Sequence, residues 1–255
     1  VAILMDETCP CLSEFTITIL QFSTFYILLN FLQNYLWLRT YEPFFTGMRI
    51  IGIIMLVIGS LWGYFQQSIQ RMHAFFMVAE NGILIYLLGV KTEQSLTIFF
   101  SLLFIRVSTS LIWALAVKSL GPGTDFSLGS LRGFFHRNPF ISMALIIAYL
   151  SIAGLPLLPA FPYKTALVTI AYAESMNYGI AMTLGMLFLL AKGFSLTRIL
   201  ADSRESSGEW ITETNGQKVL LTLGMLVLIF NSFYPNFFNQ FIATIQSQFQ
   251  IIISG

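Results

Sequence analysis

A lysine directly after a proline-rich interruption is the residue best suited to chemistry in this sequence. The run SIAGLPLLPAFPYK carries Gly154, Pro156, Pro159 and Pro162, then Lys164, between two apolar stretches. Because proline removes a backbone donor and clashes with the preceding turn, no continuous helix passes through this run. Half-helix ends beside an ionisable residue are an arrangement that ion transporters use. The run therefore predicts a site that moves a proton or a cation.

The sequence places Lys164 beside the helix break but leaves its partner and its role open. Burial disfavours the charged form of an amine, so a buried Lys164 can exchange a proton. The alternative is a lysine that extends to the membrane surface or forms a structural ion pair. Glu80 lies inside another apolar segment, and we expect it to pair with either Lys164 or Arg106. The pair would either take part in ion transfer or be a structural ion pair. Arg106 keeps its charge, so it sets a field or a contact and does not relay protons.

The composition is that of a helical membrane protein whose solvent is the lipid bilayer. Of the 255 residues, 56% are hydrophobic and 10% are charged, and the net charge is +1. These values exclude an ordinary soluble domain and predict no nucleic-acid partner. The two cysteines, Cys9 and Cys11, are two positions apart and have no histidine cluster to join, so neither a metal site nor a disulfide is expected.

Apolar windows predict an all-α fold, a polytopic transmembrane helix bundle over residues 1–235 with one discontinuous helix. The expected segments are Phe15–Leu38, Met48–Gln66, Met72–Val90, Leu96–Val117, the broken Pro139–Glu174, Tyr178–Leu196 and Lys218–Tyr234. The chain begins with Val1 and has no charged segment followed by a cleavage site, so no signal peptide is expected.

The tail, residues 236–255, has a different pattern. Phe237, Phe241, Ile245 and Phe249 recur every four residues, with polar residues between them. This spacing predicts an amphipathic helix at the membrane interface or on a neighbouring subunit. The tail has no basic face, so packing on protein is favoured over binding to anionic lipid.

Basic residues are distributed unequally between the two ends of the predicted segments. One side receives seven: Arg71, Lys118, Arg132, Arg137, Arg198, Arg204 and Lys218. The other side receives three: Arg39, Arg49 and Lys91. The excess predicts that the N-terminus and the loops Lys118–Asn138 and Arg198–Lys218 face the cytoplasm, stroma or matrix.

For the remaining ionisable residues the sequence predicts only an approximate position in the membrane. Lys192 lies near the end of its segment, so we expect its amine to extend to the membrane surface. His73 and Glu174 are expected at boundaries of their segments. No glycine-rich nucleotide loop, CxxC pair, haem-type histidine pair or nucleophile–base pair occurs in the sequence. We therefore expect no cofactor and no catalytic site in this chain.

Four stretches resemble the antiporter-like subunits of respiratory complex I, of membrane-bound hydrogenases and of multisubunit sodium/proton antiporters. LSIAGLPLLPAFPYKTALV at 150–168 is similar to the broken helix of that family, typically LSLAGLPP followed by a lysine or glutamate. SLGSLRGFFHRNPF at 127–140, GSLWGYFQQSIQRMHAFFMVAENGI at 59–83 and TCPCLSEFTITILQFSTFYILLN at 8–30 resemble further family stretches in the same order. The likeness covers nearly the whole chain and matches the second part of a usual subunit.

The resemblance implies a membrane subunit of a redox-driven, proton-translocating complex that oxidises NAD(P)H or ferredoxin and reduces quinone. Flavin, Fe–S clusters and quinone would then be held by partner subunits. The membrane would be an energy-converting one: a bacterial inner, thylakoid or mitochondrial inner membrane. The expected partners are the other membrane subunits of such a complex.

The chain departs from the family at its titratable positions. The family lysines of the first broken helix and of the AYSS stretch fall on Gln21 and Gln70, while Arg71 is kept. The usual histidine falls on Glu80, and the expected histidine and lysine of the fourth segment are missing from LFIRVSTSLIW. Glutamine cannot exchange a proton near neutral pH. Lys164, Glu80, Arg106, Lys192, Gln21, Gln70 and Arg71 remain as candidates for an ion path.

Two functional interpretations follow. In the first, Lys164 and Glu80 alternate in protonation and contribute to a proton or cation path. In the second, the chain is a scaffold with the antiporter fold that no longer moves ions, as the two glutamines suggest. A free-standing solute transporter is less favoured because a second broken repeat is missing, and a membrane enzyme is less favoured still.

Overall fold

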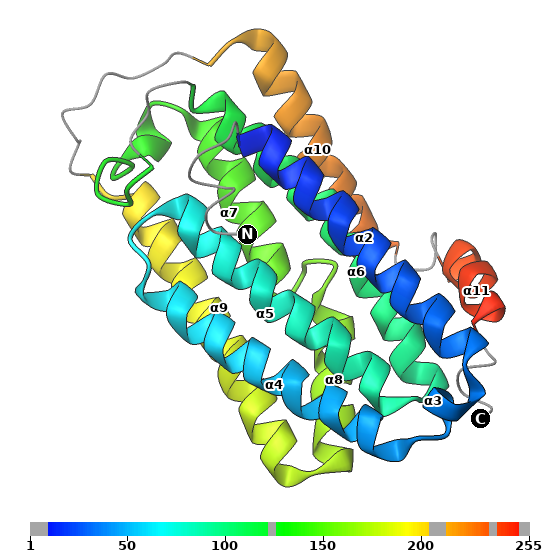
Figure 1. Cartoon of the computed structure of the whole chain (residues 1–255). Helices are drawn as coiled ribbons and strands as arrows, with labels where there is room; N and C mark the ends of the chain where they lie inside the picture. The colour runs from blue at the N-terminus through cyan, green and yellow to red at the C-terminus, as the bar shows by residue number, and fades with distance from the viewer. Residues whose placement is uncertain (1–9, 122–125, 204–212, 235–238, 250–255) are drawn as a thin grey trace.

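The computed structural model describes residues 10–121, 126–203, 213–234 and 239–249. Regular structure in these ranges is helical, apart from an isolated bridge between Ser68 and Ser127. The helices are α2 (Pro10–Asn34), α3 (Leu36–Arg39), α4 (Glu42–Phe65), α5 (Ile69–Val90), α6 (Glu93–Ser119), a 3-10 turn (Phe134–His136), α7 (Pro139–Ala153), α8 (Phe161–Glu174), α9 (Met176–Leu200), α10 (Asn215–Phe233) and α11 (Asn239–Gln248). Figure 1 shows the long helices side by side in an elongated bundle.

Six of the described helices are long and apolar enough to cross a membrane: α2, α4, α5, α6, α9 and α10. The shorter α7 and α8 stand where the broken segment was predicted. The all-α polytopic bundle and its interruption are thus confirmed. The first predicted segment, Phe15–Leu38, ends earlier than expected, because α2 stops at Asn34 and α3 follows as a separate turn.

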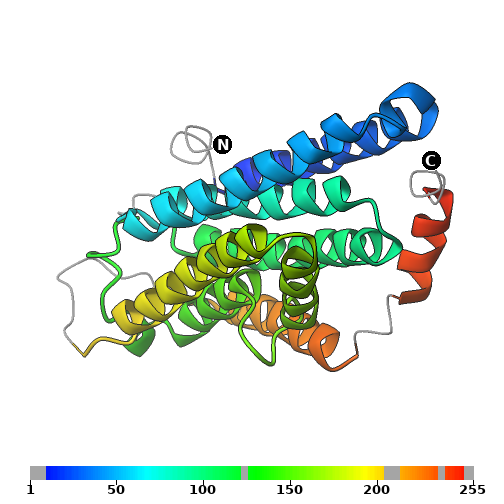
Figure 2. The same cartoon turned by 90° about the horizontal axis from the view of Figure 1, so that it is seen from below.

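Helices α5 and α6 form the centre of the bundle, and most of their residues are buried. Helices α2 and α10 both pack on α6 and expose most of their surfaces. In Figure 2 these two helices lie at opposite edges of the bundle, with α6 between them. The interior face of α5, which carries Glu80, is therefore enclosed on several sides.

The α4–α5 pair packs backbone against backbone. A Cβ added at Gly82 would lie 2.4 Å from the carbonyl oxygen of Gly52, and a Cβ at Gly52 would lie 2.6 Å from the carbonyl oxygen of Gly82. Only residues without a side chain allow two helices to approach this closely, as is common in membranes. The close approach fixes α5 against α4 and so fixes the position of Glu80.

Two connections are joined at the end of the bundle where α5 begins. The backbone nitrogen of Ile69 donates to the carbonyl oxygen of Phe126 over 2.9 Å, and that of Leu128 donates to Gln67 over 2.7 Å. The α4–α5 connection and the α6–α7 loop therefore form one hydrogen-bonded unit at this end (Figure 1).

The tail helix α11 packs on α6 of the same chain. Gln246 accepts from the Thr97 hydroxyl over 2.9 Å and donates to the Glu93 carbonyl over 3.3 Å. The buried side of α11 carries Ile242, Gln246 and Phe249, while Phe241 is 56% exposed. The predicted amphipathic helix is present between 239 and 248, but its buried face is rotated from the expected one because Gln246 is drawn inward by polar partners on α6. Phe237 lies outside the described residues.

Candidate functional site

The interruption between α7 and α8 is built from two left-handed residues. Gly154 ends α7 at φ 80°, and its nitrogen donates to the carbonyl oxygen of Leu150 over 3.0 Å. Leu157 has φ 76°, and its carbonyl accepts from the Ser232 hydroxyl of α10 over 2.5 Å. Pro156 and Pro159 lie in the turn, and Pro162 is in the first turn of α8, where its missing N–H removes no helical bond. The predicted helix break is therefore present.

Gly154 also makes room for Lys164. A Cβ added at Gly154 would lie 2.7 Å from Cδ of Lys164. The aliphatic stem of the lysine thus runs over the backbone of the residue that ends α7. This contact directs the amine back toward the interior, and Lys164 is 2% exposed.

The amine of Lys164 forms a buried ion pair with Glu80. Nζ lies 2.5 Å from Oε1 of Glu80, and the two side chains are 3% and 6% exposed. Nζ also donates to the carbonyl oxygen of Ile152, in the last turn of α7. Of the two partners considered for Glu80, the structure selects Lys164.

Arg106 faces the next residue of α5. Its Nη1 donates to Oδ1 of Asn81 over 2.7 Å, and its Nη2 donates to the carbonyl oxygen of Met77 over 3.2 Å. Arg106 is 5% exposed and cannot titrate. It holds a fixed positive charge one residue along the helix from Glu80. Arg106 therefore joins α6 to α5 through Asn81 and Met77 and does not itself move a proton.

The expectation for Lys192 is wrong. Lys192 does not extend to the membrane surface: it is 4% exposed, and Nζ donates to the carbonyl oxygens of Tyr64 and Gln66 over 2.8 and 2.7 Å. These carbonyls belong to the end of α4, where helical acceptors have no helical partner. Lys192 therefore joins α9 to the end of α4, and its amine is held by these two carbonyls and not by Glu80.

The other candidates are scattered along α5 and α2. His73 lies near the start of α5, where it was expected, but it is fully buried, and its ring stacks on Trp113 at 4.4 Å between centroids. Gln70 is buried, whereas Arg71 is exposed at the start of α5. Gln70 precedes Glu80 by ten residues, roughly 15 Å along a helix axis. Gln21 is partly buried on α2, and its Nε2 has no hydrogen-bond partner among the residues that the structure describes.

Arg49 forms a second charged group, which the sequence did not single out. Its Nη1 lies 2.6 Å from Glu174, at the end of α8, and its Nη2 lies 2.6 Å from Glu42 of α4. The glutamates lie 125 and 7 residues from Arg49. Of these two ion pairs, only the one between Glu42 and Arg49 could have been predicted from sequence, because the two residues lie on one face of the same helix.

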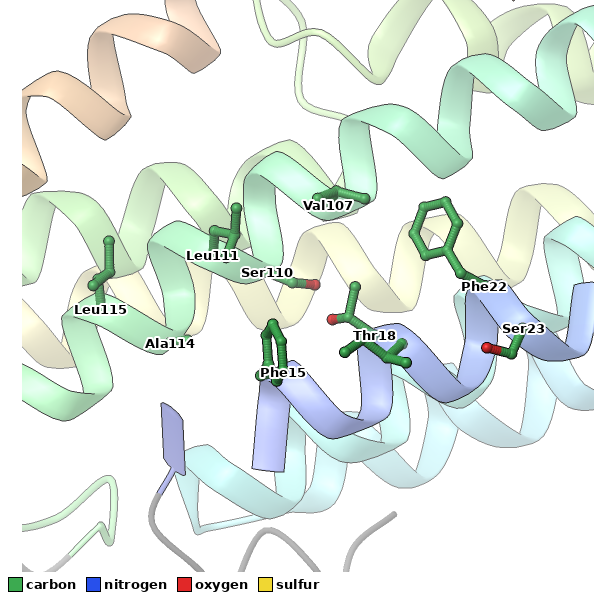
Figure 3. Close-up of a pocket in the computed structure, with 10 residues that line it drawn as sticks. Phe15, Thr18, Phe22, Ser23, Val107, Ser110, Leu111, Ala114 and Leu115 are labelled. Atoms are coloured by element: carbon green, nitrogen blue, oxygen red, sulfur yellow. The ribbon is translucent and has the colours of Figure 1, made fainter. Parts of the chain in front are cut away.

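An open groove of about 610 Å³ lies between α2 and α6, away from the buried ion pair. Figure 3 shows its apolar lining, including Phe15 and Phe22 of α2 and Leu111 and Leu115 of α6. Ser110, one of its few polar residues, has a buried hydroxyl with no hydrogen-bond partner in the described part of the chain. The groove lacks titratable side chains, so it is not part of the ion-path candidate. In the described residues no group of three or more His, Cys, Asp or Glu could hold a metal ion.

Comparison with curated proteins finds subunits of quinone oxidoreductases. The chain is 27% identical over 122 residues to NAD(P)H-quinone oxidoreductase subunit 2 of Gloeobacter violaceus, covering 47% of this chain and 24% of that protein. It is 30% identical over 128 residues to NADH-quinone oxidoreductase subunit N of Deinococcus radiodurans, covering 49% and 26%. The matched part is thus about a quarter of each relative.

Solved structures share the fold over a larger part of the chain. A chain of the membrane-bound sulfane sulfur reductase, an archaeal respiratory membrane complex, is 17% identical and has a TM-score of 0.79, covering 89% of this chain and 47% of that one. A chain of respiratory complex I from Thermus thermophilus with bound NADH is 16% identical with a TM-score of 0.70, covering 83% and 46%. These TM-scores show a shared fold.

A family model for the transmembrane part of NADH:quinone oxidoreductase and Mrp antiporter subunits matches residues 10–189. The matched range includes α2 to α8, the helix break, and both members of the Lys164–Glu80 pair. The match covers most of the stretches whose resemblance was seen in the sequence, and the chain belongs to the NADH:quinone oxidoreductase/Mrp antiporter transmembrane family.

Proposed function

We propose that this chain is an antiporter-like membrane subunit of a redox-driven complex and contributes to a proton or cation path. The observation that carries the proposal is the ion pair between Lys164 and Glu80, held beside a helix break inside a membrane bundle. Buried charges in a membrane are unfavourable, so an ionisable pair at a broken helix supports an ion-handling role. The complex would be related to complex I, and it would transfer electrons from NAD(P)H or ferredoxin to quinone.

In this proposal Lys164 is the group that exchanges the proton. With the pair ionised, Glu80 stabilises the ammonium. Transfer of a proton from Nζ to the carboxylate leaves two neutral groups, and the reverse transfer restores the ion pair. This chain would hold no redox cofactor, and flavin, Fe–S clusters and quinone would belong to partner subunits.

We also propose a direction for the chain in the membrane. The α6–α7 connection and the end of α9 lie at the same end of the bundle (Figure 1). Lys118, Arg132, Arg137 and Arg198 lie in or beside these segments, and this basic cluster supports placing that end at the cytoplasm, stroma or matrix. The membrane would be an energy-converting one, and the partners would be other membrane subunits.

The alternative is a scaffold that keeps the fold and no longer moves ions. Gln21 and Gln70 favour this alternative, because amides stand where the resembling family has lysines and cannot replace them in proton exchange. A buried ion pair is also compatible with a purely structural role. One experiment distinguishes the two functions.

The test is proton transfer by the assembled complex in proteoliposomes. Lys164→Ala is expected to reduce redox-driven proton transfer more than tenfold while subunit composition and quinone reduction without a gradient persist. Lys118→Ala removes an exposed lysine at the end of α6 and is the matched control. Unchanged proton transfer in correctly assembled Lys164→Ala would overturn the ion-path proposal and support the scaffold.

A further inference from the structure

The outer face of α4 consists of four exposed isoleucines, Ile50, Ile51, Ile54 and Ile58. Residues three and four positions apart lie above one another on a helix, so the four side chains form one continuous stripe. From Ile50 to Leu61 the other residues of α4 are buried or half-buried. The stripe therefore presents an apolar surface over about 12 Å of helix length.

The opposite side of α4 is the one that packs on another helix of this chain. A Cβ added at Gly52, Gly59 or Gly63 would lie 2.6, 2.7 or 2.4 Å from the nearest atom of α5. Small residues allow transmembrane helices to approach each other this closely. On the outer side, a Cβ at Gly47 would meet nothing within 4 Å, and no small residue lies four positions before or after it. The outer face of α4 therefore lacks the paired small residues on which a second helix would pack.

Exposed aromatic residues lie at both ends of the isoleucine stripe. The first aromatic cluster, before and at the start of α4, consists of Tyr35, Trp37 and Tyr41. The second aromatic cluster, in the last turn of α4, consists of Trp62, Tyr64 and Phe65. Figure 1 shows α3, which carries Trp37, and the α4–α5 connection at opposite ends of the bundle. The exposed side of α4 thus changes from aromatic to aliphatic and back to aromatic along its length.

The distance between the two clusters matches the thickness of a membrane. Trp62 follows Tyr41 by 21 residues, which corresponds to about 31 Å along a helix axis. The hydrocarbon core of a bilayer is about 30 Å thick, and tryptophan and tyrosine are enriched at its two interfaces. Polar residues follow at both ends, because Glu42 beside the first cluster and Gln67 beyond the second are exposed. This order is the one expected for a helix whose outer face contacts lipid.

Helix α2 shows that this order is not shared by every exposed helix of the bundle. Its exposed aromatic residues occur along its whole length, at Phe15, Phe22, Tyr26 and Phe31. Ser23 and Thr24 are also exposed near its middle. An aliphatic centre with aromatic ends therefore distinguishes α4 from α2, although both helices are long and apolar enough to cross a membrane.

We propose that the outer face of α4 contacts membrane phospholipids in the assembled complex and that no partner subunit covers it. The acyl chains lie on the four isoleucines, and the head groups of the two leaflets lie level with the first and the second aromatic cluster. Indole N–H and phenol O–H groups can donate to ester and phosphate oxygens while their rings stay in the apolar region. The two clusters therefore set the depth of the bundle in the bilayer, and partner subunits attach to other sides of it. This lipid contact follows from the membrane bundle alone and does not require an ion path.

The test is photolabelling of the purified native assembly in liposomes that contain a phospholipid with a diazirine at the middle of one acyl chain. We expect peptide mass spectrometry to find severalfold more adducts on the four isoleucines than on Leu56, which is fully buried in the same helix. A second phospholipid, with the diazirine in its head group, is expected to label the two aromatic clusters and not the isoleucines. Adducts of the mid-chain probe on Trp37 or Trp62 in place of the isoleucines would overturn the assigned depth.

A photoreactive residue at position 54 tests for a protein partner. When p-benzoylphenylalanine replaces Ile54, we expect irradiation of the assembly to give lipid adducts and no cross-link to another subunit. A cross-link to a subunit would overturn the proposal, as would absence of lipid adducts from the isoleucines of the native assembly while other helices are labelled. The native labelling decides the question even if the variant fails to assemble.

A pair of lysine substitutions tests the assigned depth independently. Ile54→Lys places a charge in the hydrocarbon region, where it is unfavourable, and is expected to lower the amount of chain recovered in the membrane severalfold. Gln67→Lys adds the same charge beyond the second aromatic cluster and is expected to leave recovery unchanged. Equal recovery of the two variants would contradict the proposal. None of these readouts depends on proton transfer, so failure of the Lys164 test and failure of the lipid contact are separate outcomes.

Discussion

The backbone of Gly154 and the side chain of Lys164 occupy space that no larger residue could share. A Cβ at position 154 would lie 2.7 Å from Cδ of the lysine. The same glycine has φ 80°, a conformation that is strained for residues with a side chain. The residue that ends α7 therefore also decides where the amine of α8 lies, and a substitution there affects both.

We expect Gly154→Ala to lower the free energy of unfolding by about 1–3 kcal/mol through backbone strain alone, with the clash against Lys164 adding to it. Thermal unfolding in detergent measures the loss. Gly47→Ala in α4 is the control, because a Cβ there meets nothing within 4 Å. Alanine favours the helix over glycine, so Gly47→Ala is expected to be neutral or stabilising. Equal stability of the two variants would contradict the proposed contact.

Replacing one member of the buried ion pair is expected to destabilise the protein more than replacing both members. Lys164→Met or Glu80→Met leaves one buried charge without a partner, and each is expected to cost about 3–5 kcal/mol. The double variant is expected to cost much less than the sum of the two. Chemical denaturation in micelles, analysed as a double-mutant cycle, gives the coupling energy.

The surface pair of Arg132 and Asp202 is the control for that cycle. Its atoms are 3.3 Å apart, but the side chains are 47% and 30% exposed. Solvent screens such pairs, so a cycle on these two residues is expected to give a coupling below about 1 kcal/mol. A coupling of similar size at both pairs would show that burial does not strengthen the Lys164–Glu80 interaction.

Lys192→Met is expected to loosen the end of α4. The change removes the ammonium that bonds to the carbonyls of Tyr64 and Gln66, which leaves terminal acceptors of the helix unpaired. We expect amide hydrogen exchange to accelerate severalfold over residues 63–68, with proton transfer retained. Lys118→Met, which changes an exposed lysine, is the control. Loss of proton transfer together with unchanged exchange would place Lys192 in the ion path.

Gln246→Leu is expected to release α11 from α6. The change removes the hydrogen bonds that Gln246 makes with the Thr97 hydroxyl and the Glu93 carbonyl oxygen. Limited proteolysis of the chain in detergent measures the release as faster removal of the tail. Ser247→Ala is the matched control, since that hydroxyl is bonded within α11 to Thr244. If both variants resist proteolysis equally, the apolar contacts alone hold the tail.

The sequence was sufficient to predict the helices and the interruption. Runs of apolar residues set the lengths of the spans, and the prolines and Gly154 set the break, because both signals are local. The burial of Lys164 also followed from its place inside an apolar stretch. The choice of Lys164 over Arg106 as the partner of Glu80 needed the structure, since it depends on helices far apart in the chain.

The burial of Lys192 and of His73, which the sequence did not indicate, has the same origin in both cases. Each residue lies near the end of its own helix, and a reading of one helix places such a residue at a membrane surface. In the fold, the end of α4 reaches Lys192, and Trp113 of α6 covers His73. Contacts between distant helices decide both positions, and neither spacing nor composition encodes them.

Helix α8 is fastened at its two ends by opposite charges on different helices. Near its start, Lys164 is tied to α5 through Glu80, and at its last residue Glu174 is tied to α4 through Arg49. Because α4 and α5 are themselves in backbone contact, both ion pairs attach α8 to the same pair of closely packed helices. Any sliding or rotation of α8 as a unit must therefore release both ends together, whereas a proton exchanged at Lys164 would free only one.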